Sequence, residues 1–213
     1  MSKVFVFNHP LINNKLAIIR DEKTGTNLFR QNVNEIASMM VYEATRNLHT
    51  AKVDIKTPCG IAQCETLDGE VVIVPILRAG LGMLDGVLRV IPTGRVGYLG
   101  LSRDEMTLEP MEYYQKFPKC IVDSNTTVLL VDPMCATGGS VIHACNVLKK
   151  NGVKNIIYVG IVGAPEGVKA VQEAHPDVDI YLAALDEKLN EVGYIVPGLG
   201  DCGDRLNGTK ETL

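Results

Sequence analysis

Residues 127–140 combine an acid, hydroxyl side chains and a glycine-rich turn in an order that predicts a binding site. Val128–Val131 is a short, uninterrupted apolar run, which is typical of a central strand buried on both faces of a parallel sheet. Asp132 follows it directly, and small residues occupy 136–140, where a backbone can approach a ligand closely. From Val141 onwards the apolar residues recur at helical spacing. The run therefore predicts a strand, an acid, a small-residue loop and a helix.

The loop before such a helix suits a phosphate, because the first N–H groups of a helix are unpaired and the positive end of its dipole lies behind them. The spacing differs from the Gly-x-x-x-x-Gly-Lys-Ser/Thr loop that binds ATP and from the Gly-x-Gly-x-x-Gly turn of dinucleotide-binding proteins. A carboxylate such as that of Asp132 can accept hydrogen bonds from vicinal sugar hydroxyls while the loop binds a phosphate on the same sugar. We therefore predict a phosphorylated sugar as ligand; a strand, turn and helix without any ligand is the alternative.

Residues 131–140, Val-Asp-Pro-Met-Cys-Ala-Thr-Gly-Gly-Ser, resemble the phosphoribosyl-pyrophosphate (PRPP) signature of type I phosphoribosyltransferases. The Asp-Pro form of this motif resembles that of the uracil phosphoribosyltransferase family. Most relatives in the wider class carry two adjacent acids where this chain has Val131 and Asp132, so one ribose contact must come from elsewhere. The resemblance implies that PRPP is bound by Asp132, Pro133, Met134, Cys135, Ala136, Thr137, Gly138, Gly139 and Ser140.

Two arginines are candidates for contacts with pyrophosphate. Arg78 follows a predicted buried strand, 71–76, in a turn of small residues whose backbone N–H groups can face an anion. Arg103 opens a polar stretch, 103–116, which is long for a connection inside a sheet and is typical of a lid. The resemblance implies that both arginines bind PRPP and share catalysis with Asp132. The alternatives are a structural salt bridge for Arg78 and a solvated charge run for Arg103.

The second diagnostic stretch is 193–204, where four glycines and a proline predict a shaped loop rather than a helix or strand. It resembles the uracil-binding segment of the uracil phosphoribosyltransferase family. The resemblance implies uracil contacts from Ile195, Gly200, Asp201 and Cys202, and it places the Asp201 carboxylate near the ribose of PRPP or a metal ion. Because the loop has few polar side chains, we expect backbone N–H and C=O groups to recognise the base.

The alternation of strand and helix patterns predicts an α/β fold with an open, mainly parallel sheet and flanking helices, in which ligands bind beyond the carboxyl ends of the strands. Turn residues within 50–69 favour a hairpin. We expect one domain, 1–213, with a flexible lid and a small C-terminal hood over the base. The other predicted strands are 95–101, 155–162 and 178–185.

The resemblance implies transfer of the phosphoribosyl group of PRPP to uracil, giving UMP and pyrophosphate in pyrimidine salvage. Mg²⁺ would be held mainly by PRPP, because this ion prefers substrate phosphates to an all-protein cage, with Asp201 as a further candidate ligand. No general base is evident, so positioning and electrostatic stabilisation are expected to lower the barrier. The alternatives are a purine or orotate phosphoribosyltransferase and a PRPP-sensing regulator that binds RNA.

Composition narrows the partners and the compartment. A net charge of −4 and a pI of about 5.6 argue against a nucleic-acid surface. The sequence has no apolar run of 18 residues and no apolar signal core at its start, so we expect a cytoplasmic protein without a membrane span. A homodimer or higher homo-oligomer is expected, while activation by GTP, known in some relatives, is left open.

The six cysteines are expected to be free thiols in a chain of this length. Cys59 and Cys64 have a spacing that could hold zinc, but no second pair of ligands completes the site. Cys135 could be activated by the helix N-terminus that follows it. The favoured interpretation of Cys135 is a small residue that fills space.

Overall fold

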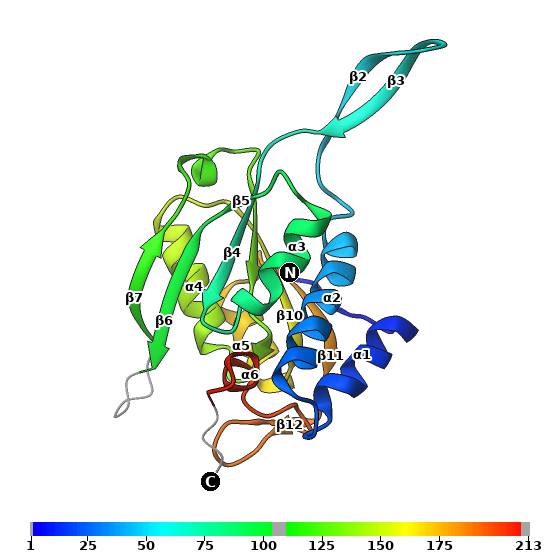
Figure 1. The fold of residues 1–213 in the computed structure, drawn as a ribbon. Coiled ribbons are helices and arrows are strands. Elements are labelled where there is room, and N and C mark those ends of the chain that lie inside the picture. The colour runs from blue at the N-terminus through cyan, green and yellow to red at the C-terminus, as the bar shows by residue number, and fades with distance from the viewer. Residues whose placement is uncertain (1, 104–109, 210–213) are drawn as a thin grey trace.

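The computed structural model describes residues 2–103 and 110–209 (Figure 1). The helices are α1 (Pro10–Arg20), α2 (Thr26–Ala44), α3 (Leu81–Val90), the 3₁₀ turn η1 (Lys119–Val122), α4 (Gly139–Lys150), α5 (Pro165–Ala174) and α6 (Cys202–Asn207). The strands are β1 (Val4–Val6), β2 (Thr50–Thr57), β3 (Gly60–Leu67), β4 (Val71–Leu77), β5 (Arg95–Val96), β6 (Tyr98–Arg103), β7 (Pro110–Lys116), β8 (Thr127–Val131), β9 (Met134–Cys135), β10 (Asn155–Gly163), β11 (Asp179–Leu185), β12 (Lys188–Leu189) and β13 (Ile195–Val196).

The central sheet has the strand order β1-β11-β10-β8-β4-β6-β7, with β5 pairing with β4 and β9 with β10. All of these pairs are parallel except β6 with β7. In Figure 1 the short C-terminal elements β12 and α6 lie at the end of the sheet to which the β6 arrow points. The predicted open, mainly parallel α/β sheet is confirmed.

The apolar strands of the sheet are buried on both faces. Along β4, Val72 and Val74 belong to the core layer that includes α4 and α5, whereas Val71 and Ile73 belong to the layer that includes α1, α2 and α3. Strand β8 divides its residues between the same two layers. Because successive side chains of a strand point to opposite faces, a strand covered on both sides needs apolar residues at every position.

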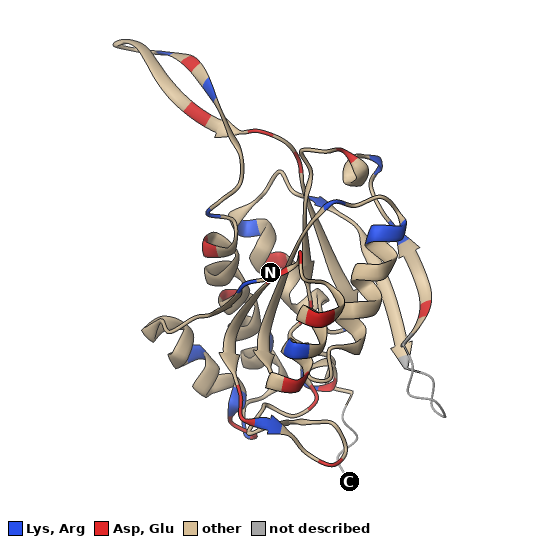
Figure 2. Ribbon diagram, turned by 180° about the vertical axis from the view of Figure 1, so that it is seen from behind, with Lys and Arg blue, Asp and Glu red and all other residues tan. Residues whose placement is uncertain are grey.

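The predicted hairpin at 50–69 is confirmed as β2 and β3, which project from the body of the molecule (Figure 1). Figure 2 shows basic and acidic residues interspersed on this hairpin and around the rest of the ribbon. The turn between β2 and β3 is closed by Thr57, whose hydroxyl accepts hydrogen bonds from the N–H groups of Cys59 and Gly60. None of the helices described is long and apolar enough to cross a membrane.

The polar stretch after Ser102 differs from the prediction of a loop. Residues 110–116 form β7, an edge strand antiparallel to β6, and residues 104–109 lie outside the described part of the chain. The Tyr113 ring packs where Gly100 of β6 has no side chain: a Cβ built on Gly100 would lie 2.6 Å from the ring. This contact between Tyr113 and Gly100 was not visible as an alternating pattern in the sequence.

Candidate active site

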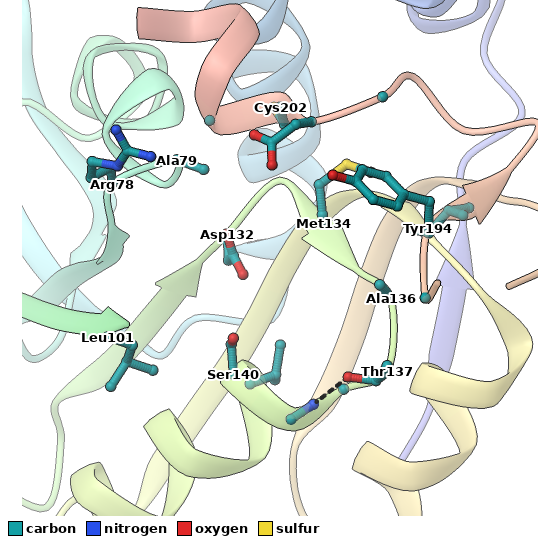
Figure 3. A pocket seen from close by; sticks show the side chains of 18 of the residues that line it. Arg78, Ala79, Leu101, Asp132, Met134, Ala136, Thr137, Ser140, Tyr194 and Cys202 are labelled. Atoms are coloured by element: carbon teal, nitrogen blue, oxygen red, sulfur yellow. Dashed lines mark hydrogen bonds between the residues drawn. The ribbon is translucent and has the colours of Figure 1, made fainter. Parts of the chain in front are cut away.

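The carboxyl ends of β4 and β8 bring the two main sequence candidates to one edge of the sheet. Pro75 is paired with Val131, so the residues that follow each strand, including Arg78 and Asp132, leave the sheet at the same end. A cavity of about 400 Å³ opens there (Figure 3). It is lined by Arg78, Ala79, Leu101, Ser102, Asp132, Met134, Ala136, Thr137, Gly138, Gly139, Ser140, Val141, Val192, Gly193, Tyr194, Ile195, Gly200, Asp201, Cys202 and Gly203.

Asp132 is held at the floor of this cavity by its own backbone. Its carbonyl accepts a hydrogen bond of 2.9 Å from the hydroxyl of the fully buried Tyr158, and its N–H donates to the Val159 carbonyl at 3.3 Å. Only 8% of the residue is exposed. Its carboxylate points into the space between Ser140 and Cys202 in Figure 3. A negative charge is therefore presented from a fixed main chain to whatever fills the cavity.

The loop after Asp132 reaches α4 through a left-handed residue. Gly138 has φ +81° and precedes the first residue of α4, and a Cβ at this position would lie 2.7 Å from the Gly167 carbonyl oxygen. The Thr137 hydroxyl accepts a hydrogen bond from the Gly139 N–H at 3.4 Å (Figure 3). The N-terminal turn of α4 therefore faces the cavity, the geometry in which helix N–H groups bind anions.

Two residues of the predicted PRPP motif do not line the cavity. Pro133 is buried, and its carbonyl accepts hydrogen bonds from Ile161 and Val162, both at 2.9 Å. Cys135 is 1% exposed, and burial together with the Asp132 charge raises the pKa of its thiol to about 12. This burial supports the interpretation of Cys135 as a space-filling residue and opposes activation of its thiol by the helix N-terminus.

Of the two candidate arginines, the structure describes the side chain of Arg78 but not that of Arg103. Arg78 lines the cavity with a side chain that is 61% exposed, and its Nη2 lies 3.7 Å from Oδ1 of Asp204 in α6. A pair this exposed and this long restrains the guanidinium only weakly. Arg103 is the last residue of β6, and its side chain lies outside the described part of the structure. Closure of 103–116 as a lid stays a prediction.

The C-terminal segment covers the other side of the cavity, and it is more regular than the predicted loop. Ile195 belongs to the β12–β13 hairpin, and Cys202 begins α6 because the Asp201 carboxylate accepts a hydrogen bond of 2.8 Å from the Asp204 N–H and caps the helix. Ile195, Gly200, Asp201 and Cys202 all line the cavity. Burial is the main cause that raises the pKa of the Cys202 thiol, so this group stays protonated.

Sequence reasoning missed Tyr194 as a lining residue. Tyr194 is 47% exposed, and its side chain lies beside Met134 in Figure 3. The signal that could have found it is an aromatic residue inside a glycine-rich stretch, where no core requires one.

The carboxylates of the cavity fit a metal ion that is held largely by a ligand. Asp132 and Asp201 both line it, and oxygen donors of this kind suit Mg²⁺. Within residues 2–103 and 110–209, no three His, Cys, Asp or Glu side chains gather as a ready-made metal site.

Comparison with protein families and with individual relatives places the chain among the uracil phosphoribosyltransferases. The family model described as uracil phosphoribosyltransferase matches residues 6–209. The uracil phosphoribosyltransferase of Clostridium beijerinckii is 58% identical over 211 residues, which cover 99% of this chain and 100% of that protein.

Solved structures agree on the fold. The AQ2163 protein from Aquifex aeolicus is 38% identical, with a TM-score of 0.92 and coverage of 98% of this chain and all of that one. Adenine phosphoribosyl transferase from Trypanosoma brucei, solved in complex with AMP, pyrophosphate and ribose-5-phosphate, is only 14% identical, with a TM-score of 0.59 and coverage of 94% of this chain and 89% of that one. At that identity the likeness concerns the fold alone.

Proposed function

This chain belongs to the uracil phosphoribosyltransferase family, and from that premise we propose how the residues of its cavity carry out the reaction. The enzyme transfers the 5-phosphoribosyl group of PRPP to uracil and gives UMP and pyrophosphate, a step of pyrimidine salvage. The observation that supports the proposal most is that Asp132 and the N-terminal turn of α4 face one cavity.

In our assignment the 5′-phosphate of PRPP binds at the first turn of α4. The backbone from Gly138 to Ser140, the Thr137 hydroxyl and the positive end of the helix dipole would all favour an anion there. The ribose would then lie over Asp132, whose carboxylate accepts hydrogen bonds from its two vicinal hydroxyls. Asp201, on the opposite wall of the same cavity, would supply the ribose contact that Val131 cannot make.

Pyrophosphate departure depends on positive charge around it. Arg78 is poised for this role, because its weak pairing with Asp204 can be exchanged for a phosphate oxygen, and Arg103 would join from the end of β6. Asp132 and Asp201 are the carboxylates that would hold a Mg²⁺ ion carried in by PRPP; bound there, such an ion neutralises charge on the pyrophosphate.

Transfer breaks the bond from the anomeric carbon to the pyrophosphate oxygen, and the electron pair of this bond leaves with the pyrophosphate. The bond to uracil N1 forms, and the N1 proton passes to the departing pyrophosphate. Positive charge develops on the ribose ring as the first bond breaks. The nearby Asp132 carboxylate stabilises that charge, so catalysis comes from positioning and electrostatics rather than from a general base.

Uracil would lie against the C-terminal segment, in reach of Ile195 and of the backbone from Gly200 to Cys202. Uracil presents an acceptor, a donor and an acceptor along O2, N3–H and O4. A backbone N–H facing O4 and a carbonyl facing N3–H would match it, whereas cytosine would meet a donor with its amino group and an acceptor with its bare N3. Unpaired buried polar groups make that rejection steep, on the order of 10⁴-fold.

The decisive experiment measures pyrophosphate release from PRPP with uracil, cytosine, orotate and hypoxanthine side by side. We expect turnover with uracil alone, and turnover that is abolished by EDTA and restored by Mg²⁺. Preferred use of orotate or hypoxanthine would contradict the base assignment. Repeating the uracil assay with and without GTP tests an allosteric effector.

Two further properties follow the family resemblance. We infer a homo-oligomer, supported by the projecting β2–β3 hairpin, which exposes 44% of Ile55 and 78% of Ile61 to solvent. Light scattering of the purified protein measures the assembly, and a monomer at micromolar concentration would refute it.

A cytoplasmic location is supported by six unpaired cysteines, the state expected of a reducing compartment.

A further inference from the structure

The backbone N–H and carbonyl of Gly198, in the C-terminal segment 193–204, are both hydrogen-bonded by a buried ion pair, Arg20 and Asp186. We call this ion pair the clamp. The N–H of Gly198 donates a hydrogen bond of 2.8 Å to Oδ2 of Asp186, and its carbonyl accepts one of 2.6 Å from Nη1 of Arg20. The two side chains also pair with each other: Nη1 and Nη2 of Arg20 lie 2.8 and 2.6 Å from the two carboxylate oxygens of Asp186. The two side chains and the two backbone groups of Gly198 therefore form a closed ring of charge-assisted hydrogen bonds.

The clamp is sheltered from water and joins distant parts of the chain. The Asp186 side chain is 5% exposed and that of Arg20 is 25% exposed. Arg20 is the last residue of α1, and Asp186 follows β11 directly, where its N–H donates to the Gly163 carbonyl at 2.8 Å. An ion pair this buried, with bidentate geometry and a further hydrogen bond to the Gly198 carbonyl, holds its partners far more firmly than a surface pair does.

Gly198 has a left-handed backbone conformation, which only glycine adopts readily. Its φ is +60°, and a Cβ there would lie 2.1 Å from the Ile195 carbonyl oxygen. The chain is thus folded tightly back on the residue that lines the cavity. A left-handed glycine is conformationally free in isolation, so its single orientation must be imposed by contacts.

The next residue is held in the same manner. The Leu199 carbonyl accepts a hydrogen bond of 2.8 Å from Nη1 of Arg205, whose Nη2 donates to the Asp21 carbonyl at 2.6 Å. The Arg205 guanidinium lies 4.3 Å from the centre of the Phe29 ring. Two consecutive carbonyls immediately before Gly200 are therefore fixed by guanidinium groups, and neither Arg20 nor Asp186 is among the described residues that line the cavity.

We propose that Arg20 and Asp186 are positioning residues that set the base selectivity of the enzyme by fixing the main chain of 198–200. The proposal rests on the base-binding role assigned above to the C-terminal segment. If backbone groups recognise uracil, no side chain in the cavity determines the choice of base. The residues that fix the position of the backbone then determine it. Displacement of these groups by a fraction of an ångström weakens both the fit to uracil and the mismatch with cytosine.

The test is steady-state kinetics of Asp186→Asn, with uracil and PRPP varied separately. Asparagine has the size of aspartate but cannot accept from Arg20 with both of its terminal atoms. We expect the KM for uracil to rise about ten-fold or more, the loss that follows when a charged hydrogen-bond acceptor is removed. The KM for PRPP should stay at the wild-type value, and the preference for uracil over cytosine should fall.

A matched control is Asp177→Asn, the same exchange near the other end of β11. Asp177 accepts a hydrogen bond of 2.6 Å from Lys149, and it lies away from the C-terminal segment. The Asp177→Asn variant should leave both KM values and the selectivity unchanged.

A second variant, Arg20→Lys, keeps the positive charge, but a single ammonium cannot reproduce the bidentate fork while also reaching the Gly198 carbonyl. It should repeat the Asp186→Asn effect in a milder form, and it decides the question if Asp186→Asn does not fold.

Gly200→Val, measured in parallel, separates this inference from the assignment on which it rests. If Gly200→Val leaves the KM for uracil unchanged, the C-terminal segment does not bind the base and both ideas fail. If Gly200→Val blocks uracil while folded Asp186→Asn and Arg20→Lys keep the wild-type KM and selectivity, the clamp is structural only and the inference alone fails. An equal rise of KM for uracil and PRPP in both clamp variants would also overturn it.

Discussion

Replacement of Asp132 by asparagine is the most direct test of the cavity, because the structure predicts a loss of charge without a loss of shape. The backbone of Asp132 is held by the Tyr158 hydroxyl and the Val159 carbonyl, and neither bond involves its carboxylate. Asparagine has the same size and can occupy the same position. The change therefore removes a negative charge from the floor of the cavity and replaces one acceptor atom by a donor.

The size of the effect follows from burial. Because only 8% of Asp132 is exposed, we expect water to screen its carboxylate little, so its bonds to the ribose hydroxyls should have the strength typical of charged acceptors. Such a bond contributes about 1.5–3 kcal/mol, and each factor of ten in rate corresponds to about 1.4 kcal/mol, so kcat/KM for PRPP should fall roughly ten- to a hundred-fold.

The assay follows pyrophosphate release with PRPP varied at saturating uracil, and a thermal melt establishes that the variant is folded. Asp177→Asn serves as the control, since it removes a charge at the opposite end of the sheet and should leave kcat/KM unchanged. A folded Asp132→Asn enzyme with wild-type kcat/KM for PRPP would refute the assignment of its carboxylate to the ribose. A loss that appears only in the KM for uracil would refute it as well.

Gly139→Val should place a branched side chain where the phosphate binds and abolish PRPP binding, measured by calorimetry; unchanged affinity in the folded variant would mean that the loop is only structural. Cys202→Ala should leave the ratio of uracil to cytosine turnover nearly intact, because the thiol is buried and protonated; a lost preference would contradict backbone recognition. Burial, helped by the nearby Lys149 ammonium and opposed by Asp177, lowers the pKa of His175 below its ordinary 6.5. As the pH falls, His175 is protonated in the unfolded chain before it is protonated in the folded chain. The free energy of unfolding should therefore keep its full value above about pH 6.5 and decrease as the pH drops towards the folded-state pKa. Urea melts across this range measure the fall, and a His175→Gln variant with the same pH slope would exclude His175 as its cause.

The sequence by itself determined the edge of the sheet at which the cavity opens. In 127–140 the strand, the acid, the glycine turn and the helix are consecutive, and each is specified by local rules: apolar residues at every strand position, a left-handed glycine, and helical spacing afterwards. Neighbouring parallel strands end at the same edge, so Arg78 could be expected near Asp132 before any coordinates were known. Local patterns of this kind leave little for the tertiary structure to decide.

The polar stretch after Ser102 shows where such patterns fail. Residues 110–116 carry polar and aromatic side chains without a clear period, and only their pairing with β6 makes them a strand. Likewise, the glycines of 193–204 predicted a loop, whereas the capping bond from Asp204 to Asp201 starts a helix inside it. An edge strand or a short helix is stabilised by one partner, so its sequence signal is weak.

Only the tertiary structure decided what holds the base-binding segment. Arg20 and Asp186 are 166 residues apart, and Arg20 and Gly198 are 178 apart. No spacing rule connects residues at such separations, because their meeting depends on how α1 packs beside β11 and on where the sheet ends. A lone arginine at the end of a helix and a lone aspartate after a strand each read as surface charges. Folding brings them together in a buried pair, and the choice of base that we propose depends on that pair and not on any motif.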